Sequence, residues 1–71
     1  METFRLRSGD EFIKLGQLLK AMQVAESGGE AKDLILEGYV LVNGEKEVRR
    51  GRKLYSGDIV SCGKNEIKIE K

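Results

Sequence analysis

The segment from Ser27 to Gly44, with the sequence SGGEAKDLILEGYVLVNG, constrains the fold most, because it contains a helix start, a helix stop, a strand and a tight turn. Ser27 and Glu30 form a capping box, in which the serine hydroxyl accepts a hydrogen bond from the Glu30 amide while the glutamate accepts one from the Ser27 amide. Gly38 ends the helix, because glycine adopts the left-handed conformation of a helix C-terminus without steric cost. The helix should present one apolar stripe to a core, formed by Ala31, Leu34 and Ile35.

A β-hairpin should follow this helix. Residues 39–42 favour an extended backbone, and Asn43-Gly44 favours a two-residue turn with positive φ at both positions. Residues 45–48 should therefore pair back with residues 39–42.

Periodic apolar residues predict the remaining elements. Alternating patterns predict strands at residues 3–7, 59–62 and 66–70, the last of them antiparallel. Residues 11–14 fit either a short strand or the lead-in to a helix, and we favour the strand because Phe and Ile prefer extended backbone. A short amphipathic helix should begin at Leu15, with an apolar side formed by Leu15, Leu18, Leu19 and Met22. We therefore expect an α+β fold in which two short helices, joined as a helix-corner-helix, pack on a small, mostly antiparallel sheet.

Length and composition limit the kinds of protein that this chain can be. Its 71 residues suffice for one domain, 1–71. A domain of this size buries only ~60% of its unfolded surface, so no elaborate active-site cleft is expected. The single cysteine, Cys62, cannot form an internal disulfide, and without histidine or cysteine pairs we expect no metal site and no cofactor. No apolar run is long enough to span a membrane, and the N-terminal sequence is unlike a signal peptide, which predicts a cytoplasmic protein.

Four of the thirteen basic residues lie within the five-residue window 49–53, although the net charge is only +1. No acidic residue interrupts this window, so its charges should repel one another in the free protein, and their density favours a nucleic-acid contact. A solvated turn is the alternative interpretation and is an equally common outcome. The four residues are Arg49, Arg50, Arg52 and Lys53.

The helix start at Ser27 is a second candidate contact. Gly28 and Gly29 leave backbone amides open to a closely approaching anion, and the helix dipole adds roughly half a positive charge there. Lys20 and Lys32 should lie on the solvent sides of the two helices, so a continuous basic face that includes the window is geometrically possible. The alternative is that Ser27 only caps the helix and that the glycines only form a tight corner.

The remaining candidates give weaker indications. Tyr39 and Tyr55 could stack on unpaired bases, but we expect both to be half-buried in the small sheet. Because stacking groups are scarce, the chain should recognise the shape of a folded nucleic acid instead of single-stranded sequence. No carboxylate pair has a spacing suited to acid and base roles, so we expect no enzymatic activity. The other candidates are assigned core positions (Phe4, Phe12 and Cys62) or plain surface positions (Arg7 and Lys14).

The chain also contains a spaced series of residues: Leu15, Leu18, Leu19, Ser27, Ala31, Lys32, Ile35, Gly38, Val40, Val42, Asn43, Gly44, Leu54, Gly57, Asp58 and Ile59. This series resembles the RNA-binding domain first recognised in the small-subunit ribosomal protein S4. The resemblance covers a core of residues 15–62, flanked by the strands at 3–7 and 66–70, and points to the stand-alone bacterial proteins of the YaaA/YbcJ-like group. One position departs from the pattern, because Gly28 stands where many relatives have an arginine, which removes one expected phosphate contact.

The resemblance implies a small, non-enzymatic factor that binds structured RNA, either ribosomal or transfer RNA, in ribosome assembly or translation. RNA and the ribosome are the implied partners, and a monomer is expected. Together with the arguments above, it predicts RNA contacts at Lys20, Ser27, Gly28, Gly29, Lys32, Arg49, Arg50, Arg52 and Lys53. A β-grasp-like protein-interaction module is the alternative, because its sulfur-carrier members share a VNG-like hairpin and a late Gly-Asp turn. Those carriers end in Gly-Gly, whereas this sequence ends in Ile69-Glu70-Lys71.

Overall fold

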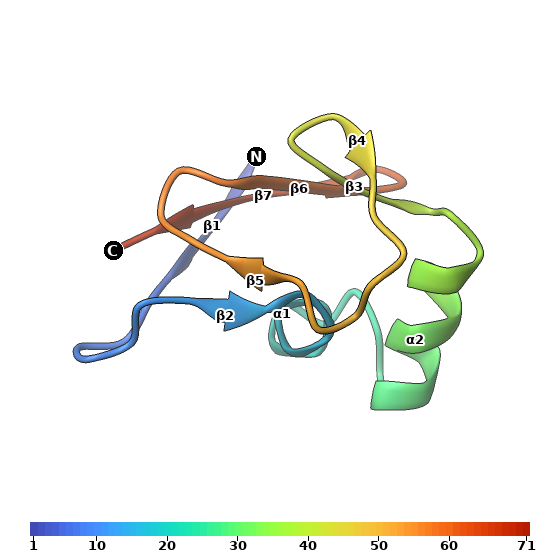
Figure 1. Ribbon diagram of the computed structural model, residues 1–71, viewed down its shortest axis with the longest axis horizontal. Coiled ribbons are helices and arrows are strands. Elements are labelled where there is room, and N and C mark those ends of the chain that lie inside the picture. Colours follow the sequence, from blue (N-terminus) through green and yellow to red (C-terminus); the bar gives the residue numbers. More distant parts are fainter.

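The computed structural model describes residues 1–71 and contains two helices and seven short strands (Figure 1). In chain order they are β1 (Glu2–Arg5), β2 (Ile13–Lys14), α1 (Leu15–Ala21), α2 (Gly28–Leu36), β3 (Val40–Val42), β4 (Glu45–Lys46), β5 (Lys53–Leu54), β6 (Ile59–Cys62) and β7 (Asn65–Glu70). The expected α+β fold, with two helices and a mostly antiparallel sheet, is confirmed. Neither helix is long and apolar enough to cross a membrane.

The strands form two separate sheets. The larger sheet has the order β1-β7-β6-β3-β4, in which β1 runs parallel to β7 and every other neighbouring pair is antiparallel. The smaller sheet is a two-stranded antiparallel ribbon of β2 and β5, which lies next to α1 (Figure 1). The strand favoured at residues 11–14 exists but is limited to Ile13–Lys14. Its pairing with β5 and the parallel pairing of β1 were not predicted.

Helix α2 begins and ends where the sequence predicts. The Ser27 hydroxyl accepts a hydrogen bond from the Glu30 amide at 3.1 Å, whereas the reciprocal bond from the Ser27 amide to the Glu30 carboxylate is not formed. The apolar stripe is confirmed, with Ala31 and Ile35 buried. Gly38 has a φ of +85°, and its amide donates to the Ile35 carbonyl, which closes the last turn.

The predicted hairpin is also present. Asn43 and Gly44 both have positive φ, at 52° and 84°, as a two-residue turn of this type requires. Strand β4 is shorter than expected, because only Glu45 and Lys46 pair with β3, and the Glu47 amide makes one further bond to the Val40 carbonyl. After this bond the chain leaves the sheet and runs toward the helices (Figure 1).

The core lies between the two helices and one face of the larger sheet. Alternation along β7 illustrates this arrangement, because Ile67 and Ile69 are buried whereas Lys68 is exposed on the opposite face. Cys62 is buried, which raises the pKa of its thiol and confirms it as a small core residue. The buried apolar residues are Leu6, Leu15, Leu18, Leu19, Ala25, Ala31, Ile35, Val40, Val42, Leu54, Val60, Cys62, Ile67 and Ile69.

Candidate functional site

The basic window 49–53 is fixed against the N-terminus of α1. The first helical amides would lack partners without such a contact. Here the Leu15 amide donates to the Arg52 carbonyl, and the Gly16 amide donates to the Arg50 carbonyl, each at 2.9 Å. The backbone carbonyls of the window therefore cap α1, which fixes the backbone from which the arginine side chains project.

Next to this contact, α1, α2 and the window enclose a hollow of about 260 Å³. Three cationic residues from three separate segments line it: Lys14 at the end of β2, Lys20 in α1 and Arg50 in the window. No acidic residue lies among its walls, which are completed by Gly16, Gln17, Gly28, Ala31 and Gly51. We call this surface the basic hollow. Its charge and shape suit a single phosphate group or a short turn of a phosphate backbone.

The start of α2 opens onto the basic hollow at Gly28. No atom lies within 4 Å of the position that a Cβ at Gly28 would occupy, so an anion can approach this backbone closely. The amides of Gly28 and Gly29 donate no hydrogen bond within the chain, whereas the Ser27 hydroxyl is already engaged by the Glu30 amide. The free Gly28 amide thus adds a donor to a site that is already cationic, and the free Gly29 amide follows it in the first turn of α2.

Arg49 and Arg52 are arranged differently, because both bind the carboxylate of Glu47. The Arg49 Nε and Nη2 donate to it at 3.0 and 3.1 Å, and the Arg52 Nη1 donates at 2.7 Å. Glu47 is only 6% exposed, and these hydrogen bonds lower its pKa to about 2. The expected repulsion within the window is therefore wrong for these two arginines. The acid that neutralises them, Glu47, lies two residues before the window, and the backbone turns so that both arginines reach its carboxylate.

Lys32 and Lys53 do not line the basic hollow. Lys32 is exposed on α2, one helical turn after Gly28, and Lys53 lies over the ring of Phe12 with its Nζ 4.9 Å from the ring centroid. The structure thus places Lys20, Gly28 and Arg50 together, with Gly29 beside them. The other predicted side-chain contacts lie outside the basic hollow: Lys32, Arg49, Arg52 and Lys53.

Sequence reasoning missed two residues of this region. The sequence pattern assigns Lys14 a plain surface position, whereas in the structure it shares the basic hollow with Lys20 and Arg50. Its position one residue before an amphipathic helix was the available signal, since a residue there projects beside the helix start. Glu47 was not singled out at all, although it is the acid nearest in sequence to a dense arginine cluster.

Two aromatic assignments are also corrected. Tyr39 is 60% exposed and Tyr55 is 47% exposed, and both lie just outside the strands, so neither is part of the sheet as expected. Phe12 does not join the core either, because it lies on the outer side of the small ribbon, against Tyr55. Phe4 packs against the core as predicted.

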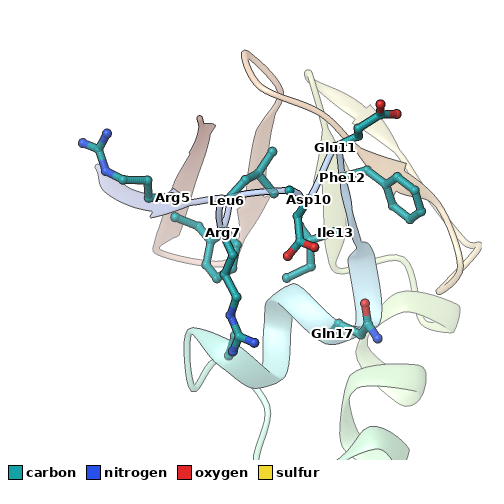
Figure 2. Close-up of a pocket in the computed structure, with 11 residues that line it drawn as sticks. Arg5, Leu6, Arg7, Asp10, Glu11, Phe12, Ile13 and Gln17 are labelled. Atoms are coloured by element: carbon teal, nitrogen blue, oxygen red, sulfur yellow. The ribbon is translucent and has the colours of Figure 1, made fainter.

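A larger cavity of about 740 Å³ lies between the β1–β2 connection and α1 (Figure 2). Its wall carries both charges, with Arg5 and Arg7 opposed by Asp10 and Glu11. Because these charges balance, the cavity offers a phosphate no net attraction, and it is a weaker candidate than the basic hollow.

The sequence as a whole matches one known family, whose model covers residues 4–70 and is described as the S4 domain. The chain belongs to the S4 domain family. This result confirms the family resemblance noted from the sequence.

Three comparisons with individual proteins agree with this membership. The chain is 58% identical over 50 residues to the probable ribosome maturation protein RlbA of Bacillus subtilis (strain 168). These 50 residues are 70% of each of the two chains. It is 36% identical over 69 residues to YbcJ of Escherichia coli (strain K12), covering 97% of each. The solution structure of E. coli YbcJ, described as revealing an αL motif involved in RNA binding, has a TM-score of 0.73 at 35% identity. That match covers 100% of this chain and 89% of YbcJ, which confirms the helix-corner-helix and sheet arrangement.

Proposed function

We propose that this protein binds structured RNA, ribosomal or transfer RNA, and acts as a monomeric, non-enzymatic factor in ribosome assembly or translation in the bacterial cytoplasm. The observation that carries the proposal is the basic hollow. It joins three cations from separate segments to the free amide of Gly28, with that of Gly29 next along α2, and no acid lies among its walls. Such a site binds phosphate through charge and through directed hydrogen bonds together.

The names of the relatives support the same class of ligand. The YbcJ structure is described by an RNA-binding motif and RlbA by ribosome maturation, and both resemble this chain over most of its length. The wider set of predicted contacts extends the surface beyond the hollow. Arg49 and Arg52 keep exposed edges around Glu47, and with Gly51 and Lys53 they line a shallow depression on the other side of the window.

The rigidity of the site favours a folded RNA over a flexible strand. Lys14, Lys20 and Arg50 belong to a ribbon, a helix and the loop that caps this helix, so the distances between the backbone positions of the three residues are fixed. A folded RNA presents phosphates at equally fixed positions, whereas an unstructured strand must lose conformational freedom to match them.

Charge reversal at Arg50 tests this proposal. Arg50→Glu should weaken binding to a folded ribosomal RNA fragment and reduce the slope of log affinity against log salt by roughly one for each phosphate that the protein no longer binds. Lys68→Glu is the matched control, because it makes the same change of charge on the opposite face of the large sheet, and it should leave the slope unchanged. Fluorescence polarisation with a labelled RNA at several salt concentrations measures both variants. Equal losses of affinity in both would mean that only net charge matters, and an unchanged slope for Arg50→Glu would remove the basic hollow from the interface.

A further inference from the structure

The outer face of the β2–β5 ribbon carries two lysines and, beside them, two aromatic residues that the proposed phosphate site does not explain. Ile13 pairs with Leu54 and Lys14 pairs with Lys53, so Phe12 and Tyr55 are the next pair in this register. Leu54 is buried and Ile13 packs against the core. Because side chains alternate along a strand, the neighbouring pairs, Phe12 with Tyr55 and Lys14 with Lys53, project on the other side of the ribbon.

The aromatic pair on this face is preorganised. The rings of Phe12 and Tyr55 have their centroids 6.0 Å apart and are inclined at 53°. Figure 2 shows the Phe12 ring on the opposite side of the strand from Ile13. The Tyr55 backbone is anchored on both sides, because its amide donates to the Asp58 carboxylate at 2.8 Å and its carbonyl accepts from the Asp58 amide at 3.0 Å. Since Lys53 lies over Phe12, the Tyr55 ring is the one left open to solvent.

The lysine pair on the same face is unfavourable in the free protein. Lys14 and Lys53 are directly opposite each other in an antiparallel ribbon, and like charges in that position are destabilising. Neither lysine forms an ion pair, since every ion pair of this chain involves Arg5, Arg49 or Arg52. A phosphate group lying against the ribbon would remove this repulsion.

The ribbon face is continuous with the basic hollow, because Lys14 belongs to both. Phe12 precedes Lys14 by two residues, which is roughly 7 Å along a strand. We propose that this face binds one unpaired nucleotide of the RNA, whose base stacks on Tyr55 and whose phosphate lies against Lys14 and Lys53. The inference rests on the proposed function and adds to it a second recognition element, an unpaired base beside a folded region.

The test uses a short RNA stem with a single bulged nucleotide and the same stem with an abasic residue at the bulge. The wild-type protein should bind the RNA with the base roughly 5- to 100-fold more tightly, as expected from the stacking of one base on an aromatic side chain. Tyr55→Leu should abolish this preference and leave affinity for the abasic stem unchanged. Tyr55→Phe keeps the ring and should retain the preference. Tyr39→Leu, at the other exposed tyrosine, is the matched control and should behave as wild type.

Fluorescence gives a second measurement that does not depend on a variant of Tyr55. The chain has two tyrosines and no tryptophan, so Tyr39→Phe leaves Tyr55 as the sole strongly fluorescent residue. Its emission should be quenched by the stem with the bulged base and much less by the abasic stem.

The possible failures are distinguishable. If the two stems bind wild type equally while Arg50→Glu still weakens both, the stacking inference is overturned and the proposed function stands. If neither stem binds at moderate salt, the proposed function fails and the stacking inference falls with it.

Discussion

Glu47 shows how one side chain organises the basic window. It is a nearly buried carboxylate held by two arginines, and it also accepts a hydrogen bond from the Arg49 amide at 3.0 Å. These contacts shape residues 47–52 so that Arg50 is left free to face the basic hollow. Sequence reasoning found the four cations of the window but could not divide them into bound and free. That division depends on where the chain turns after β4.

Glu47→Gln should therefore destabilise the fold in a way that depends on pH. The native pKa of about 2 lies below the ordinary value of 4.5, so the ionised carboxylate contributes stability fully above pH 4.5, and this contribution is lost as the pH falls toward 2. At pH 7 we expect a loss of about 1 kcal/mol, because the exposed Arg49 leaves its pair screened by water.

Urea unfolding of both proteins at pH 7 and at pH 3 measures this difference. The gap in the free energy of unfolding between wild type and Glu47→Gln should be clearly smaller at pH 3. An equal gap at pH 7 and at pH 3 would show that the charge of the Glu47 carboxylate is not the cause of the destabilisation.

The turn of the β3–β4 hairpin makes side-chain hydrogen bonds to a distant part of the chain. The Asn43 side chain donates from Nδ2 to the Asp58 carboxylate at 3.0 Å and accepts from the Ile59 amide at 2.9 Å. The hairpin turn is thereby tied to the Gly57-Asp58 turn that positions Tyr55. Elements with local signals, such as the caps of α2 and this turn, were predicted from the sequence. The β1–β7 and β2–β5 pairings were not, because they join residues far apart in sequence, such as Glu2 with Ile67 and Lys14 with Lys53.

Two substitutions of Asn43 separate the contribution of its side-chain hydrogen bonds from that of its positive φ. Asn43→Ala loses both side-chain hydrogen bonds and strains a residue at positive φ, and it should cost about 2 kcal/mol. Asn43→Gly loses the same bonds but tolerates positive φ, so it should be less destabilising than alanine. Thermal unfolding followed by circular dichroism ranks the variants. A glycine variant as unstable as the alanine variant would contradict the contribution assigned to backbone strain.

At the scale of the whole molecule, the fold concentrates positive charge although the net charge is only +1. Arg50 is far from Lys14 and Lys20 in sequence and meets them because α1, α2 and the window converge. The sequence predicted Lys20, Gly28 and Arg50 as contacts through charge density and the helix start. It could not predict the inclusion of Lys14 or the exposure of Tyr55, since both follow from the small ribbon. The result is one rigid basic site with an aromatic pair at its border.

The most direct test of shape recognition compares the binding of two RNAs of equal length and charge in the same moderate salt, one folded and one unstructured. A folded ribosomal or transfer RNA fragment should bind more tightly, because its phosphates are already held at separations that a rigid site can match. Arg50→Glu should reduce this preference as well as the affinity. Equal affinity of the wild-type protein for the two RNAs, or a preference for the unstructured strand, would contradict shape recognition and leave a general binder of polyanions.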